Sequence, residues 1–305
     1  MTQTRTALVL LGLGVIFGSA FLFMKVLVAE IGPLTLVTGR LILGAAAVLT
    51  VLAIRREPLG WTPALAAKVT LLATLSLVIP FGLIAWAEQH IASGMAAALI
   101  STMPLFTALF ATGVFADERL TAGRLAGLVA GFAGVVVLTG GDFDLTDSSV
   151  LGQFAVIGGA ASYAAGAVYS RALLKSQNAL SLGGLEMVIG ALIAAPLAFA
   201  FDGVPTFALS LKAWSALLAL GVVGTGVAFV GYLWLVDKAG SVTGSLVTYI
   251  VPVVGLALGW AVLNEGIGLN ALVGVLLIIL GVVSAMIAKT PDPDPQTLPV
   301  PAAAE

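Results

Sequence analysis

The stretch "STMPLFTALFATGVFADE" (residues 101–118) and the stretch "TYIVPVVGLALGWAVLNE" (residues 248–265) share one pattern: a proline within an apolar run, followed by a glutamate. Pro104 and Pro252 are 148 residues apart, and Glu118 and Glu265 are 147 residues apart. A proline inside a soluble helix removes a backbone hydrogen bond and destabilises the helix by about 3 kcal/mol. Two such prolines at matching positions indicate that the second half of the chain repeats the first.

Other residues repeat at the same distance and extend the match to neighbouring segments. They are one tryptophan pair and two glycine pairs: Trp86 with Trp234, Gly127 with Gly274, and Gly134 with Gly281. One residue is missing from the second copy between its proline and its glutamate. The duplication therefore covers several consecutive segments rather than one motif.

The composition is typical of a membrane protein. The 305 residues are 60% hydrophobic and 9% charged, whereas soluble domains are about 25% charged. The mean hydropathy of +1.14 is too high for a soluble core, because too little polar surface remains to cover it. A net charge of −2 gives no reason to expect nucleic acid as a partner, and the absence of cysteine excludes disulfides.

Apolar runs of about 20 residues suit the hydrocarbon layer of a bilayer. We predict ten spans, at 7–28, 33–54, 68–87, 92–115, 121–140, 150–173, 179–200, 212–236, 241–262 and 268–288. With the N-terminus in the cytoplasm, ten Lys and Arg residues fall at cytoplasmic ends and one, Lys212, at an outer end. Cytoplasmic loops carry the excess of positive charge, so we expect both termini to be cytoplasmic.

The predicted fold class is an all-α membrane protein with ten transmembrane helices in two inverted five-helix repeats. Residues 1–145 form the first repeat, residues 146–289 the second, and the proline-rich residues 290–305 a disordered cytoplasmic tail. Five is an odd number, so the two copies have opposite orientations in the membrane. Inverted repeats are the sequence sign of secondary transporters that work by alternating access. Pro104 and Pro252 are then expected to act as hinges or cavity residues, although membrane helices also carry more proline in general.

Two longer segments resemble a known family. "AWAEQHIASGMAAALISTMPLFTALFATGVFADERLTAGRLAGLVAGFAGVVVL" (85–138) and "GYLWLVDKAGSVTGSLVTYIVPVVGLALGWAVLNEGIGLNALVGVLLIILGVV" (231–283) are similar to the two copies of the EamA domain. This domain defines the ten-helix branch of the drug/metabolite transporter superfamily, and the resemblance covers roughly residues 7–288. It implies a carrier of the inner membrane, most often an exporter of amino acids, other metabolites or toxic compounds. It also matches Glu118 and Glu265 to the family's glutamate at span ends, where binding to backbone amides of the next helix is expected.

Ionisable residues inside spans are expensive and often functional. Arg40 is predicted to bind a substrate carboxylate or to anchor a gate, with bonding to helix carbonyls as the structural alternative. Lys25 either contributes to the substrate site or extends toward the interface. Glu186 is the repeat partner of Arg40, 146 residues later, and is the candidate for proton coupling. Its alternative is an ion pair at the cytoplasmic end with Arg171 or Lys175.

Aromatic side chains make platforms for flat or apolar substrates. Tyr163, Tyr232 and Tyr249 lie deep in their spans and are predicted cavity residues. Trp86 is also a candidate, unless it belongs to the aromatic belt at the interface. His90 is expected in a solvated loop. GxxxG patterns at 127–131, 240–244 and 255–259 predict close helix contacts.

These features predict a secondary transporter, not an enzyme, that exports amino acids or related small amphipathic metabolites and drugs. The sequence has no GxSxG and no second histidine for hydrolysis, and no GxxxxGK[ST] for a nucleotide-driven pump. A flippase for a lipid-like substrate, or an anionic metabolite exchanger on the same fold, is the alternative. The expected partners are a small-molecule substrate, the lipid bilayer and protons. No cofactor, metal or nucleic acid is expected, and a monomer or weak dimer is expected in the bacterial inner membrane.

Overall fold

A computed structural model of the chain describes residues 3–115, 121–140, 146–173, 177–204, 208–239 and 246–287. Glu118, Lys175, the GxxxG at 240–244 and the predicted tail at 290–305 lie outside these residues. All regular structure in the described part is helical, and no strand occurs in it. The helices are α1 (Gln3–Leu27), α2 (Pro33–Arg55), α3 (Pro63–Ala73), η1 (Thr74–Val78), α4 (Ile79–Ala87), α5 (Ser93–Ile100), α6 (Met103–Val114), α7 (Ala122–Thr139), α8 (Ser148–Leu173), α9 (Ala179–Phe201), α10 (Leu211–Leu218), η2 (Ala219–Val227), α11 (Ala228–Ala239), α13 (Val247–Leu263) and α14 (Leu269–Ile287).

Seven of the described helical segments are long and apolar enough to cross a membrane. They are Thr4–Leu27, Pro33–Arg55, Pro63–Ala87, Ser93–Val114, Ser148–Ala172, Ala179–Phe201 and Leu211–Lys238. Three further apolar helices are shorter than these seven segments: Leu125–Thr139, Val247–Leu263 and Leu269–Ser284. The helical fold class and the membrane location are thus confirmed, while the count of ten spans and the inversion of the two repeats stay predictions.

Two of the long spans contain a π-helical segment. In η1 and in η2 the helix widens before it returns to ordinary α geometry in α4 and in α11. Residues 74–78, shifted by the 148-residue spacing of the prolines, fall at 222–226, which lie inside η2. Short π segments inside α-helices are frequently found at functional sites, so the residues around η1 and η2 are candidates for the functional site.

The two matched prolines lie in different local structures. Pro104 begins α6, after a break at Ser101 and Thr102 that separates α6 from α5. The hydroxyls of Ser101 and Thr102 donate to the carbonyl oxygens three residues earlier, at Ala98 and Leu99, which tightens the end of α5. Pro252 instead lies inside the uninterrupted helix α13, where the side chain is buried.

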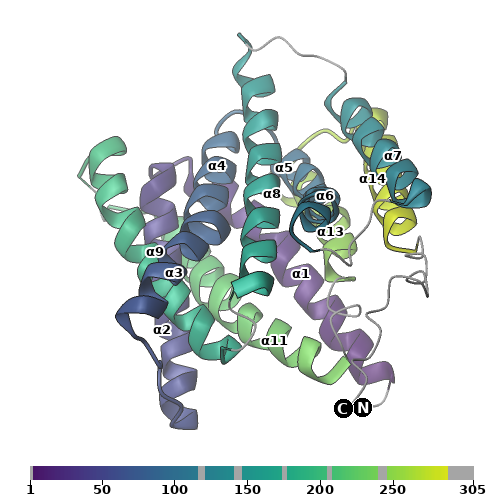
Figure 1. The fold of residues 1–305 in the computed structure, drawn as a ribbon. Coiled ribbons are helices and arrows are strands. Elements are labelled where there is room, and N and C mark those ends of the chain that lie inside the picture. The colour runs from purple at the N-terminus through teal and green to yellow at the C-terminus, as the bar shows by residue number, and fades with distance from the viewer. Residues whose placement is uncertain are drawn as a thin grey trace, which may run out of the picture.

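Helix packing places segments that are distant in the sequence side by side. Figure 1 shows α7 and α14 paired at one edge of the molecule and α2, α3 and α9 at the opposite edge. The α7–α14 contact is a glycine contact: a Cβ on Gly134 would meet the Gly274 carbonyl, and a Cβ on Gly281 would overlap the Gly131 backbone. In α13, Gly255 faces Ala97 of α5 at equally close range. The close contacts predicted for the GxxxG patterns at 127–131 and 255–259 are confirmed.

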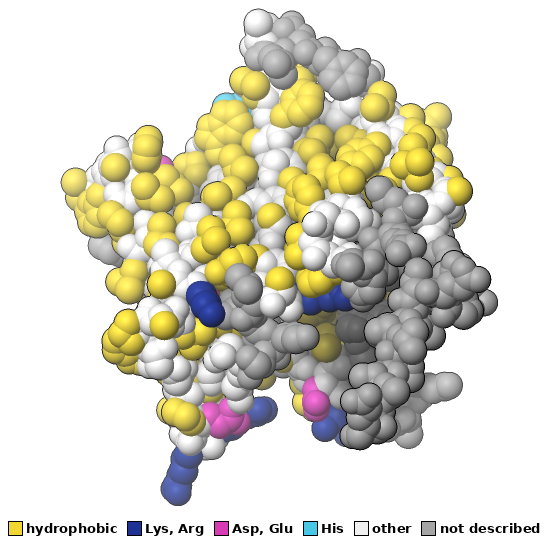
Figure 2. Space-filling view, viewed as in Figure 1, with side chains coloured by type: hydrophobic (Ala, Val, Ile, Leu, Met, Phe, Trp, Pro, Cys, Tyr) yellow, Lys and Arg dark blue, Asp and Glu magenta, His cyan; other side chains and the backbone are white. Residues whose placement is uncertain are grey.

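The surface agrees with a bilayer environment. On the face in Figure 2, hydrophobic side chains cover most of the height, and most of the Lys, Arg, Asp and Glu side chains in view lie toward one end. Large apolar side chains are exposed on almost every long helix, among them Leu8, Ile42, Leu192, Phe199 and Trp260. Lipid tails are the solvent that makes such exposure favourable.

Candidate functional site

Arg40 is the most enclosed cation among the described residues. It lies in α2, only 6% exposed, and its side chain reaches between three other spans. Nε donates a 2.8 Å hydrogen bond to the Thr225 hydroxyl of η2, and Nη1 lies 3.4 Å from the Met24 sulfur of α1. The guanidinium carbon is 3.6 Å from the ring centroid of Phe81 on α4. A cation over an aromatic face is stabilised by the negative ring centre.

No acidic side chain among the described residues forms an ion pair with Arg40. A buried charge is costly unless it is paired and hydrogen-bonded, and the hydroxyl and the ring face compensate that cost only in part. Arginine presents five N–H donors in a planar fork, of which two are directed at Thr225 and Met24. The remaining donors are suited to a carboxylate, which binds such a fork in a bidentate manner.

Tyr163 of α8 completes an aromatic wall beside Arg40. Its ring meets Phe81 edge to face, with the centroids 6.0 Å apart. The charges of Arg40 and of Glu186 both act on the Tyr163 hydroxyl, so these three side chains lie near one another. Of the residues predicted from the sequence, Arg40, Tyr163 and Glu186 are the ones that the fold brings together.

Glu186 lies in a position that corresponds to that of Arg40. It is half-buried in α9, and the Ser76 side chain of η1 is its polar neighbour. Arg40 donates a hydrogen bond to Thr225 in η2. In each half, therefore, a charged residue of the second long span lies near a hydroxyl group in the π-helical segment that belongs to the other half of the chain.

The hydroxyl partners were missed by sequence reasoning. Thr225 lies in the glycine-rich run "GVVGTGV" (221–227) and Ser76 in "TLSLV" (74–78), and neither run stands out among apolar segments. Phe81, whose ring lies under the Arg40 guanidinium, is not among the site residues predicted from the sequence. The available signal was positional: Ser76 and Thr225 are 149 residues apart, one residue from the repeat spacing.

The other predicted site residues lie apart from Arg40. Tyr232 of α11 packs edge to face on Phe17, with centroids 6.4 Å apart, and Tyr249 of α13 packs half-buried against the main core. Trp86 is 36% exposed at the end of α4, where its ring lies 4.7 Å from that of His90. His90 is exposed, as expected for a loop residue.

Lys25 is bonded to backbone rather than free at the interface. Its ammonium group donates to the carbonyl oxygen of Glu88 and, at 2.7 Å, to that of Ile91. Both carbonyls lie in the turn between α4 and α5. Lys25 therefore fastens the end of α1 to that turn.

Glu265 caps a helix of the other half of the chain. Its carboxylate accepts hydrogen bonds from the Ser93 amide at 2.8 Å, the Ser93 hydroxyl at 3.0 Å and the Gly94 amide at 3.0 Å. Glu265 was expected to bind backbone amides of the next helix, which is α14. This expectation is wrong, because the amides that it binds belong to α5. The physical reason is the left-handed residue Asn264, with φ of 55°, which ends α13 and turns the chain back toward α5.

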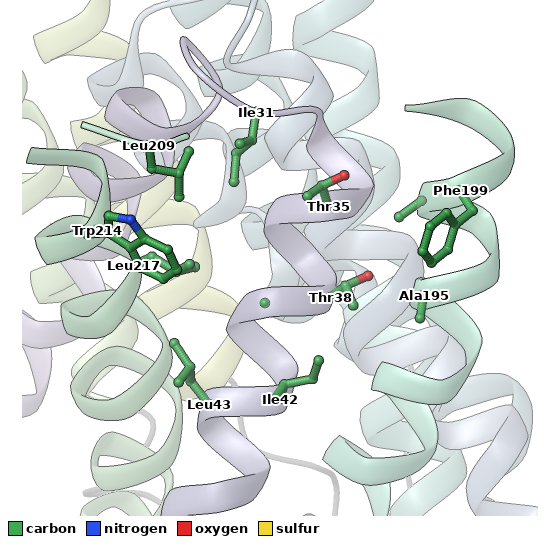
Figure 3. A pocket seen from close by; sticks show the side chains of 12 residues that line it. Ile31, Thr35, Thr38, Ile42, Leu43, Ala195, Phe199, Leu209, Trp214 and Leu217 are labelled. Carbon is green, nitrogen blue, oxygen red and sulfur yellow. The ribbon is translucent and has the colours of Figure 1, made fainter. Parts of the chain in front are cut away.

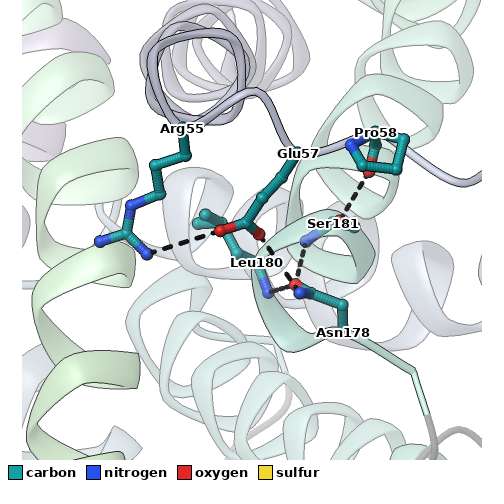
Figure 4. Close-up of polar contacts among 6 residues, drawn as sticks. All are labelled: Arg55, Glu57, Pro58, Asn178, Leu180 and Ser181. Carbon is teal, nitrogen blue, oxygen red and sulfur yellow. Dashed lines mark hydrogen bonds and ion pairs between the residues drawn. The ribbon is translucent and has the colours of Figure 1, made fainter.

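Polar contacts join α2 and α9 at both ends. At one end the Asn178 side chain caps α9 and donates to Glu57 at 3.3 Å, while the Ser181 hydroxyl donates to the Pro58 carbonyl at 3.0 Å (Figure 4). At the other end the Thr35 amide donates to Asp202 at 2.6 Å. These contacts hold the helices that carry Arg40 and Glu186 in fixed register.

Nearby, Glu30 accepts hydrogen bonds from the amide and the hydroxyl of Ser210. These bonds stabilise the carboxylate form and lower the pKa of Glu30 below its ordinary value. The turn after α1 is thereby tied to the start of α10.

An apolar cavity of about 250 Å³ lies between α2, α9 and α10. In Figure 3, Trp214 and Leu217 of α10 face Phe199 and Ala195 of α9 across α2. Its lining residues are Ile31, Thr35, Thr38, Gly39, Ile42, Leu43, Ala195, Ala198, Phe199, Leu209, Trp214 and Leu217. Arg40 is not among them, so the cavity lies on another face of α2 from the charged cluster.

Comparison with known proteins identifies relatives along the whole chain. The family model of the EamA-like transporter family matches residues 4–140 and again residues 150–287. The uncharacterized transporter YoaV of Bacillus subtilis (strain 168) is 26% identical over 281 residues, which are 92% of this chain and 96% of the relative. The uncharacterized inner membrane transporter YedA of Escherichia coli (strain K12) is 27% identical over 278 residues, 90% of this chain and 86% of the relative.

One relative has a more specific description. A probable terminal-alkyne amino-acid exporter of Streptantibioticus cattleyicolor is 30% identical over 204 residues, which are 66% of each chain. The fold is also similar to that of a solved crystal structure. The TM-score between the two is 0.66 and the sequence identity is 20%, and the match covers 92% of this chain and 97% of the other.

Proposed function

Because this chain belongs to the EamA-like transporter family, we propose that it is a secondary carrier that moves amino acids or related small amphipathic metabolites by alternating access. We place it in the bacterial inner membrane, with both termini in the cytoplasm. The observation that carries the substrate class is the buried Arg40, which has a hydroxyl and an aromatic face as neighbours and no acidic partner among the described residues. Export is the proposed direction in the cell.

Arg40 and Glu186 suit the two charges of an amino acid. The free donors of Arg40 take the substrate carboxylate in a bidentate manner. Glu186, near the same Tyr163 ring, takes the ammonium group. The ring faces of Phe81 and Tyr163 accept an apolar side chain. An amino acid with such a side chain satisfies all of these groups at once.

Two structural correspondences support a duplicated, inverted architecture of ten spans. The family model matches the chain twice, and the π-helical segments η1 and η2 fall at corresponding positions of the two halves. The contacts of Arg40 with Thr225 and of Glu186 with Ser76 follow the same correspondence. In an alternating-access cycle the halves exchange conformations around this cluster, and Pro104 and Pro252 are the proposed hinges.

A counterflow experiment in proteoliposomes tests the proposal. Vesicles loaded with unlabelled amino acids are mixed with a labelled amino acid, and the label is expected to enter. The matched control is the corresponding amine, which keeps the apolar side chain but lacks the carboxylate and is not expected to exchange. Absence of exchange across a broad amino-acid panel would contradict the proposed substrate, and equal exchange of the amine would contradict the role of Arg40.

The lateral cavity favours a second candidate, a flippase for a lipid-like substrate. Its rim includes Ile42 and Phe199, which are more than half exposed, so an acyl chain could enter from the bilayer. If this candidate is correct, Trp214→Ala should change the transfer of a fluorescent lipid between leaflets without changing amino-acid counterflow. Lipid transfer equal to that of protein-free vesicles would eliminate it.

A further inference from the structure

Glu88 is a fully buried carboxyl group without a hydrogen-bond partner among the described residues. It follows α4 directly, and its amide donates to the Ile84 carbonyl at 2.9 Å, so the backbone position is fixed. The side chain is 0% exposed, and no group among the described residues hydrogen-bonds either carboxyl oxygen. The next two residues, Gln89 and His90, are exposed.

The charged groups around Glu88 are engaged elsewhere. From α1, the ammonium group of Lys25 donates to the backbone carbonyls of Glu88 and Ile91 rather than to the carboxyl. From the loop after α13, Glu265 is occupied by the amides of α5. From α2, Arg40 contacts Thr225 and the Phe81 ring.

The other helices packed around this turn present neutral groups to it among the described residues. From α8, Gly152 packs against the Ala87 carbonyl and the His90 side chain. From α5, Ser93 and Gly94 are neutral. His90, in the same turn, stacks on Trp86.

An ionised carboxylate in this place would be strongly unfavourable. An unpaired buried charge costs several kcal/mol, and proteins avoid the cost by shifting the pKa until the group is neutral. Burial raises the pKa of the Glu88 carboxyl well above its ordinary value, while Lys25 and Arg40 act to lower it and Glu265 acts to raise it. Burial without a hydrogen-bond partner therefore favours the neutral acid over the carboxylate in this conformation.

We propose that Glu88 is a proton-binding site of this carrier, occupied in the conformation seen here, and that the transport cycle exchanges its proton for substrate. The inference rests on the proposed transport function but concerns a different residue from the sequence candidate, Glu186. Glu186 has Ser76 and Tyr163 as polar neighbours, which suits it to the substrate ammonium group instead.

Lys25 is the partner that the carboxylate needs once its proton has left. Its ammonium group already contacts the carbonyls of Glu88 and Ile91, so a rotation of the side chain, with α1 still packed on the turn, can direct it to the carboxylate. When the turn opens to solvent the proton passes to water, and the new ion pair compensates the negative charge.

Proteoliposomes with an imposed pH difference test this site. For a one-for-one exchange, a difference of one pH unit can concentrate substrate up to about tenfold. Wild type is expected to approach this value and to change the lumenal pH when substrate is added, as read by a trapped dye. Glu88→Gln is expected to exchange substrate for substrate but to show neither accumulation nor a pH change. Asp237→Asn, at an exposed carboxylate, is the matched control and should behave as wild type.

Other variants distinguish the two candidate carboxyls. Glu186→Gln should bind the amino acid more weakly, because Glu186 is assigned to the ammonium group, but the substrate that does enter should still accumulate with the pH difference. Loss of accumulation in Glu186→Gln together with full accumulation in Glu88→Gln would overturn the proposal in favour of the sequence candidate. Lys25→Met removes a charge that lowers the pKa of Glu88, so the pH midpoint of transport should move to higher pH.

An optical measurement keeps the proton site testable without transport. The infrared spectrum of the solubilised wild type should contain the carbonyl band of a protonated buried carboxyl that Glu88→Gln lacks. If amino-acid counterflow fails, the transport proposal is wrong while this band still decides the proton site. If the band is unchanged in Glu88→Gln, or if wild type moves no protons during transport, Glu88 is not the proton-binding site.

Discussion

The two π-helical segments of this protein hold charges of opposite sign in corresponding places. In η2, Thr225 accepts a hydrogen bond from Arg40 and donates one to the Leu220 carbonyl at 2.9 Å, so the hydroxyl links the cation to the helix. In η1, Ser76 is the polar neighbour of Glu186. The same backbone form therefore lies beside a cation in one half of the chain and beside an acidic side chain in the other.

The wider turn explains why both contacts occur at these segments. A π turn interrupts the regular hydrogen bonding of the helix, and carbonyl groups there need other partners. In η2 the Thr225 hydroxyl donates a hydrogen bond to the Leu220 carbonyl. In η1 the Leu75 carbonyl accepts a 2.7 Å hydrogen bond from Ser162 of α8. The difference teaches that the two π segments share a backbone form but carry different side chains, so that different groups complete their hydrogen bonding.

The largest expected effect comes from removing the charge at η2. Arg40→Gln deletes the charged fork, and charge-assisted hydrogen bonds contribute about 1.5–3 kcal/mol, so substrate affinity should fall roughly 10- to 150-fold. Arg40→Lys keeps the charge without the planar fork and should retain part of the affinity. Competition in the counterflow assay measures both, and wild-type affinity in Arg40→Gln would remove Arg40 from the site.

Glu186→Gln tests the opposite charge at η1. The amide oxygen can still accept from Ser76, so the fold should be retained, while the attraction for an ammonium group is lost. Affinity for amino acids should fall about tenfold. The corresponding deaminated acids are the matched ligands, and their affinity should change much less. An equal loss for both ligand series would contradict the assignment of Glu186 to the ammonium group.

Thr225→Val tests how much the Thr225 hydroxyl contributes to positioning Arg40, while the charge of Arg40 is kept. The substitution keeps the side-chain shape but removes both hydrogen bonds of the hydroxyl, which leaves Nε of Arg40 without its partner. A net loss of about 1 kcal/mol corresponds to roughly fivefold weaker binding. Binding unchanged from wild type, at equal protein levels in the membrane, would show that Arg40 is positioned by Phe81 and Met24 alone.

Ser76→Ala should have the smallest effect of the four. Glu186 is half-buried, so water can replace the lost hydroxyl, and a weakening of about twofold is expected. A larger loss of substrate affinity in Ser76→Ala than in Thr225→Val would contradict this order. It would show that binding depends more on the hydroxyl of η1 than on that of η2.

Much of the architecture could be predicted from the pattern of the chain. The apolar runs predicted seven described membrane spans within a few residues, because hydrocarbon thickness sets their length. Family membership followed from the doubled motifs around Pro104 and Pro252 and is confirmed. Arg40 could be singled out because a cation inside a span is rare and costly.

Other features could not be predicted, because they depend on which helices touch. The break at Ser101 and Thr102 separates α5 from α6, whereas α13 continues through the matching positions and Pro252. Both stretches have the same proline, so the proline alone did not decide the outcome. In the first stretch the hydroxyls of Ser101 and Thr102 bond back to helix carbonyls, whereas the matching positions of the second stretch carry Tyr249 and Ile250.

The sequence by itself determined the solvent of this protein, the length of its spans, its family and the presence of a rare charge in α2, since these depend on composition and on local pattern. Only the tertiary structure decided the environment of each charge. Glu88 stands in the polar run "EQHI" (88–91), which reads as an exposed turn, yet α1 covers that turn through Lys25 and leaves the carboxyl with no access to water. Burial and hydrogen bonding arise from contacts between segments far apart in the chain, and local sequence carries no information about which segments meet.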